Sequence, residues 1–124
     1  MSLQGSCFML TREKWWELNI CDDSLGNWGN QGIEVAVKTW LSGGKVMAIH
    51  NTWYAHMFRT QGGDFGFPYK LSGNEVQRTK NNVRDLLFTG KWDKAKYPIS
   101  WLIRKFLPVA NWNEEKIKQL DGNR

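Results

Sequence analysis

The sequence contains no apolar run near the roughly 20 residues that a helix needs to cross a bilayer. Its two cysteines, Cys7 and Cys21, are too few for a disulfide framework and lack the Cys-x-x-Cys spacing of zinc sites. We therefore expect free thiols in a reducing compartment, and a cytoplasmic protein. The first residues lack a charged region followed by an apolar stretch, so no signal peptide is expected.

Acidic residues are scarce relative to basic ones in residues 70–124, but not in residues 1–69. Residues 70–124 hold twelve lysines and arginines against six acidic residues, whereas residues 1–69 hold five against six. The net charge of +5 therefore comes from the C-terminal part. A basic segment is compatible with a solvated helix face, a polyanion or peripheral contact with an anionic membrane.

The chain is rich in aromatic residues. At 124 residues it is long enough for one domain but small for an enzyme that binds two substrates. Eight tryptophans are unusual at this length. Because an exposed indole is costly, most of these rings should lie in the core or line a site.

Apolar residues recur at helical spacing most clearly in the segment before Gly43-Gly44. These two glycines are expected to end that helix. Thr11 is a good N-cap, Asn27 or Asn30 can cap the next helix, and Ser72 begins a capping box. Helices are expected over residues 11–18, 30–42, 72–87 and 99–106, with a fraying segment at 113–120.

Strands are predicted from small, β-branched and alternating residues at 4–10, 45–50 and 52–58. The three strands predict an α+β fold, a small mixed sheet covered by the helices at 30–42 and 73–87. A glycine-rich loop with aromatic anchors should follow at 60–71.

Several motifs occur in a distinctive order: GSCFMLTREKWWEL, then WGNQGIEVAVKTWLSGG, then WYAHMFR. This order resembles the C-terminal half of GT-A glycosyltransferases, namely family-two enzymes and the polypeptide N-acetylgalactosaminyltransferases. The resemblance covers about residues 4–69. It implies an acceptor- and metal-side subdomain over residues 1–71 and a helical extension over 72–124 packed on it.

The resemblance assigns roles to individual residues. His56 matches the histidine that completes the metal site, usually manganese, and Arg59 matches the arginine that contacts the nucleotide diphosphate. Trp28 and Gly29 match the Trp-Gly of the acceptor-side turn, and Glu34 matches an acidic residue in the first turn of the next helix. A helix-start carboxylate stabilised by the dipole is the alternative role for Glu34.

Two departures change the implied mechanism. Inverting relatives carry Glu-Asp where this chain has Gln31 and Gly32, so the usual general base is missing. The chain can be retaining, can use Glu34, Asp22 or Asp23 instead, or can be non-catalytic. Gln31 can still hydrogen-bond a sugar hydroxyl.

The second departure is the lack of a βαβ nucleotide-binding unit and of an Asp-x-Asp motif. One histidine cannot hold manganese or magnesium, which take about six mainly oxygen ligands. We therefore expect a divalent metal, a nucleotide sugar and a glycan acceptor only in a complete enzyme. The chain alone should be inactive, and it should present an apolar face that a missing N-terminal half or a second copy covers.

The alternative function is a non-catalytic module that binds carbohydrate or nucleic acid, with Trp53 and Tyr54 as further rings able to stack on sugar or bases. Binding to nucleic acid, the less favoured case, would weaken steeply with salt. A purely structural domain would instead bury Trp28, Trp53 and Tyr54 and have no cleft near His56.

Overall fold

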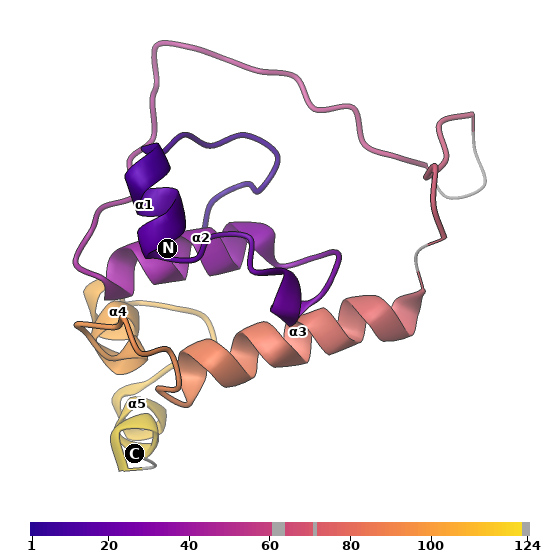
Figure 1. The fold of residues 1–124 in the computed structure, drawn as a ribbon. Helices are drawn as coiled ribbons and strands as arrows, with labels where there is room; N and C mark the ends of the chain where they lie inside the picture. Colours follow the sequence, from indigo (N-terminus) through magenta and orange to yellow (C-terminus); the bar gives the residue numbers. More distant parts are fainter. Residues whose placement is uncertain (61–63, 71, 123–124) are drawn as a thin grey trace.

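The computed structural model describes residues 1–60, 64–70 and 72–122. These residues form helices joined by turns and by one long extended segment (Figure 1). In chain order the elements are α1 (Arg12–Glu17), the short 3-10 helix η1 (Asp23–Leu25), α2 (Gln31–Leu41), α3 (Gly73–Phe88), α4 (Ile99–Lys105) and α5 (Glu114–Gly122).

The expected α+β fold is wrong, because the described residues contain no β-strand. Residues 4–10 form a turn beside the start of α2, where the Leu3 amide donates to the Gly32 carbonyl at 3.4 Å. Residues 45–50 and 52–58 are extended, but in the described part of the chain they pair with no other segment. An extended segment becomes a strand only when a neighbour takes up its N–H and C=O groups, and alternating side chains do not supply that neighbour.

The predicted helix boundaries are largely confirmed. The Thr11 hydroxyl accepts from the Lys14 amide at 3.3 Å, and the Ser72 hydroxyl accepts from the Glu75 amide at 3.2 Å. These bonds satisfy N–H groups that have no partner inside the helix. After α2, Gly43 adopts a left-handed φ of 93°, the conformation expected at a helix stop.

The core lies where α2 packs against α3 and α4, and where α4 packs against α5. Its buried apolar residues include Leu18, Ile20, Leu25, Val35, Val37, Leu41, Val83, Leu87, Trp92, Ile99, Leu102, Ile103 and Ile117. None of the described helices is both long and apolar enough to span a bilayer.

The tryptophans divide into two groups. Those in the core or packed against it are Trp15, Trp40, Trp92, Trp101 and Trp112. Trp16, Trp28 and Trp53 are exposed, with 68%, 41% and 86% of their surface accessible. Packing in the core therefore accounts for five rings and leaves three to be explained.

Candidate functional site

The turn between η1 and α2 is held against α3. Gly26 has a φ of 129°, and a Cβ atom there would lie 2.1 Å from the Thr79 hydroxyl oxygen, so only glycine fits. The Asn82 side-chain amide donates to the Leu25 carbonyl at 3.1 Å. These two contacts fix the segment that leads into Trp28.

Trp28 leaves the turn with 41% of its surface exposed. Phe67, from the loop before α3, meets its ring edge-on at 6.1 Å, and Tyr69 lies 5.9 Å from Phe67 between ring centroids. Gly29 has a φ of 98°, which lets the chain reverse immediately after the indole. We call Trp28, Phe67 and Tyr69 the aromatic wall, a set of rings able to pack against an apolar face of a ligand.

Gly32 lies where the backbone of the N-terminal segment passes closest to α2. A Cβ atom at this position would lie 2.1 Å from the Leu3 carbonyl oxygen and 3.0 Å from the Gly5 amide nitrogen. No side chain fits there unless residues 3–5 move. The glycine is therefore required by the packing, and a carboxylate at this position is incompatible with the observed fold.

Glu34 is buried and fully engaged. Its carboxylate pairs with Lys38 at 2.6 Å and accepts a hydrogen bond from the Asp22 amide at 3.3 Å. The Lys38 ammonium also donates to the Asn19 carbonyl at 2.6 Å. Glu34 is 4% exposed and Lys38 0% exposed, so the pair ties α2 to the preceding loop away from solvent.

This geometry favours a structural role for Glu34 over proton transfer to or from a substrate. Lys38 was not singled out by sequence reasoning, although Glu and Lys four residues apart on a helix are a recognised pairing signal. The Asp22 carboxylate accepts two hydrogen bonds from Ser24, one from the backbone amide at 3.0 Å and one from the side-chain hydroxyl at 2.6 Å.

Gln31, the first residue of α2, faces a cysteine. Its side-chain amide approaches the Cys21 sulfur at 2.8 Å. Cys7 and Cys21 are both free thiols, as predicted. This contact uses one N–H of the Gln31 amide, whose second N–H and carbonyl oxygen are the groups that a sugar hydroxyl would bind.

Residues 45–59, here called the extended arm, carry the remaining predicted site residues. Figure 1 shows this segment leaving the end of α2, arching away from the helices and returning toward the start of α3. Trp53 is 86% exposed, and Tyr54 is 49% exposed with its hydroxyl 3.1 Å from that of Ser6. The arm thus places two aromatic side chains in solvent.

His56 and Arg59 contact neighbouring aromatic rings. The imidazole meets Phe58 edge-on with centroids 4.2 Å apart. The Arg59 guanidinium lies 3.9 Å from the centroid of Phe65 and donates to the Gly66 carbonyl at 3.1 Å. Across the described ranges, no three His, Cys, Asp or Glu side chains gather as a metal site would require.

The loop of residues 64–70 connects the two parts of the candidate site. Its Phe65 contacts Arg59, and its Phe67 contacts Trp28. Glu34 and Gln31 are instead held by the protein itself. A purely structural domain would bury Trp28, Trp53 and Tyr54 and would have no cleft near His56. The exposure of all three rings disagrees with the first of these two expectations.

Comparison with curated proteins finds relatives that share one type of name. N-acetylgalactosaminyltransferase 7 of Rattus norvegicus is 29% identical over 124 aligned positions, which cover 98% of this chain and 18% of the relative. The Homo sapiens protein of the same name is 30% identical over 95 positions, covering 77% of this chain and 14% of the relative. A probable N-acetylgalactosaminyltransferase 9 of Caenorhabditis elegans is 26% identical over 85 positions, covering 68% and 13%.

No protein-family model and no solved structure matches the chain. The aligned segment covers less than a fifth of the length of each of these three curated relatives. At modest identity, it is homologous to a segment of the N-acetylgalactosaminyltransferases and is a glycosyltransferase-like chain.

Proposed function

We propose that this chain is the acceptor-side part of a sugar-nucleotide-dependent glycosyltransferase and is inactive by itself. The observation that carries the proposal is the aromatic wall, with Trp28 exposed on a turn that α3 holds rigid. The relatives' names support glycosyl transfer, and the chain's small share of their length supports a part rather than a whole enzyme. A nucleotide sugar and a glycan acceptor are the substrates of the complete enzyme.

In this proposal the residues of the chain bind and orient rather than transfer protons. Trp28 packs against the acceptor or the transferred sugar, and Phe67 and Tyr69 close on it from the loop. Arg59 binds the diphosphate after leaving Phe65, because a guanidinium can form two parallel hydrogen bonds with a phosphate. The contacts of Arg59 with its own loop link diphosphate binding to the position of Phe67.

The described residues do not fit a metal ion. In the described ranges His56 belongs to no group of three metal-ligating side chains, and its ring packs on Phe58. A divalent ion would supply Lewis-acid stabilisation of the leaving diphosphate only where another polypeptide segment provides carboxylates. We therefore derive no step of the reaction through a metal on this chain.

The geometry also limits the choice of base. Gly32 has no room for a side chain, Glu34 is paired with Lys38, and Asp22 accepts two hydrogen bonds from Ser24. Among the substitutes considered, only Asp23 is exposed. Three options remain: Asp23 as the base, a retaining reaction, which needs no such base, or a chain that binds acceptor without catalysing transfer.

The extended arm supports the proposal that this chain is one part of a larger assembly. It exposes large apolar side chains at Met47, Ile49, Trp53, Met57 and Phe58, and it has no ladder partner within the described part of the chain. Isolated extended chain is marginal in water, because both its backbone groups and its apolar face need a neighbour. We propose that the arm pairs with the nucleotide-binding half or, in its absence, with a second copy.

Nuclear magnetic resonance of the indole N–H groups tests the acceptor site. Addition of N-acetylgalactosamine or a glycopeptide acceptor should shift the Trp28 resonance at millimolar concentrations and leave that of Trp16 unchanged. Trp16 is the matched control, since it is 68% exposed on α1, outside the aromatic wall. Equal shifts at both indoles, or none at Trp28, would contradict the proposal.

Binding to nucleic acid is the second candidate, and the exposed rings of Trp53 and Tyr54 are the observation that favours it. Oligonucleotide affinity that collapses between low and moderate salt, and is lost in Trp53→Ala, would support it. Sugar affinity insensitive to salt and lost in Trp28→Ala would support the glycosyltransferase part instead.

A further inference from the structure

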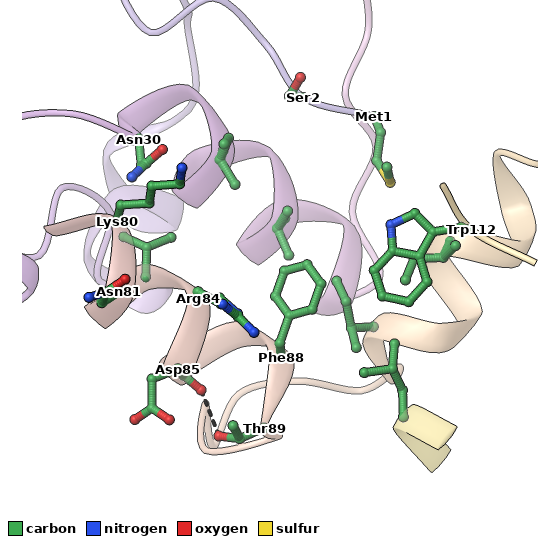
Figure 2. Close-up of a pocket in the computed structure, with 16 residues that line it drawn as sticks. Met1, Ser2, Asn30, Lys80, Asn81, Arg84, Asp85, Phe88, Thr89 and Trp112 are labelled. Atoms are coloured by element: carbon green, nitrogen blue, oxygen red, sulfur yellow. Dashed lines mark hydrogen bonds between the residues drawn. The ribbon is translucent and has the colours of Figure 1, made fainter. Parts of the chain in front are cut away.

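A hollow of about 910 Å³ lies among α2, α3 and α4, apart from the aromatic wall and the extended arm. Figure 2 shows its two ends: Lys80, Asn30 and Asn81 lie at one, and Phe88 and Trp112 project into the other. Apolar side chains from the three helices form the floor between these ends. They include Ile33, Val37, Val83, Ile99 and Ile103.

The α3 side of the hollow carries unbalanced positive charge. Lys80 and Arg84 are exposed and lie one turn apart on α3, with Arg84 between Lys80 and Phe88 (Figure 2), and neither forms an ion pair with any described residue. The one carboxylate in the lining, that of Asp85, already pairs with Lys91 at 2.6 Å. Two cations beside an apolar floor are complementary to a ligand with one anionic end and one hydrocarbon end.

We propose that this hollow binds a long-chain carboxylate. Lys80 and Arg84 hold the carboxylate, and the chain lies on the floor and ends against Phe88 and Trp112, whose ring centroids are 6.4 Å apart. The volume falls within the roughly 300–1,000 Å³ range of small-ligand pockets, which are mainly apolar with a few placed polar groups. This inference is independent of the proposed acceptor site.

Calorimetric titration of the full chain with dodecanoate, kept below its micelle concentration, tests the proposal. Each buried methylene tightens binding by about fourfold, so decanoate should bind roughly fifteenfold more weakly. Dodecylammonium has the same chain with the opposite charge, and it should bind at least about tenfold more weakly than dodecanoate.

Two variants probe the two ends of the site. The double variant Lys80→Gln/Arg84→Gln should weaken dodecanoate binding by about tenfold or more through loss of charge-assisted bonds. Ile33→Asp places a carboxylate over the floor at a position that is 40% exposed, so the helix should still fold while binding is lost. The matched control Lys45→Gln/Lys70→Gln removes two exposed cations away from the hollow and should bind normally.

Four results would each overturn the proposal. Dodecylammonium could bind as tightly as dodecanoate, or the control variant could lose as much affinity as Lys80→Gln/Arg84→Gln. Trp53→Ser could abolish binding while Ile33→Asp preserves it, which would place the ligand on the extended arm. Sedimentation could instead show that Ile33→Asp dissociates copies of the chain, which would make the hollow a protein interface.

Discussion

The buried pair of Glu34 and Lys38 makes the sharpest prediction about stability. In Glu34→Ala the Lys38 ammonium remains 0% exposed with only the Asn19 carbonyl as an acceptor, and the Asp22 amide loses its partner. Removing one member of a buried ion pair is destabilising by about 3–5 kcal/mol, because a charge stays buried without compensation. We expect the free energy of unfolding to fall by this amount.

Urea unfolding followed by far-UV circular dichroism measures the change. With a slope of about 2 kcal/mol per molar urea, the midpoint should move down by roughly 2 M. Because small domains are stable by only about 5–15 kcal/mol, Glu34→Ala can be largely unfolded, and Glu34→Gln then supplies a milder variant that retains an acceptor for the ammonium.

The double variant Glu34→Leu/Lys38→Met tests the reasoning itself. Replacing both charges by apolar side chains removes the desolvation penalty, so this variant should be close to the parent chain or up to about 1–4 kcal/mol more stable. The matched control is Glu17→Ala, which breaks a solvent-exposed pair with Lys14 and should leave the urea midpoint nearly unchanged. A loss below 1 kcal/mol in Glu34→Ala, or a double variant as unstable as the single one, would refute a buried, mutually dependent pair.

Three further predictions concern local structure. Gly32→Ala should lower stability by about 1–3 kcal/mol, because its Cβ meets the Leu3 carbonyl oxygen; an unchanged thermal midpoint would contradict this contact. Ser72→Ala should cost about 1 kcal/mol by removing the cap on the Glu75 amide, while the same change at an uncapped exposed serine should be neutral. Amide hydrogens of residues 45–59 should exchange within seconds in the isolated chain and become protected when a partner pairs with the extended arm, and protection in the monomer would contradict an unpaired arm.

Local signals predicted the helices well. The positions of Thr11, Ser72 and Gly43 determine where helices begin or end through hydrogen bonds or backbone conformations that involve only a few neighbouring residues. Such interactions are readable from sequence because both partners lie within one turn. Aromatic anchors in the loop were also predicted, although the contact of Phe67 with Trp28 was not.

The strands were predicted wrongly because a strand, unlike a helix cap, depends on a partner segment distant in the sequence. Residues 45–59 have the composition and alternation of strands, and Figure 1 shows them as a long segment with neither helix nor strand. A sheet needs a second segment at hydrogen-bonding distance, and the described chain provides none for them. Composition and alternation thus predicted strands wrongly, because they carry no information about the partner that a strand needs.

The amino-acid sequence alone determined the helices, the side-chain caps of α1 and α3, the free cysteines and the likeness to glycosyltransferases, since each depends on neighbouring residues or on motif order. Asn30 does precede α2, as predicted, but its side chain makes no capping hydrogen bond. Tertiary structure alone decided the state of the candidate site. It buried Glu34 against Lys38, excluded any side chain at Gly32, and brought Phe67 to Trp28. Burial and close approach depend on segments far apart in the chain, so no local pattern could have revealed them.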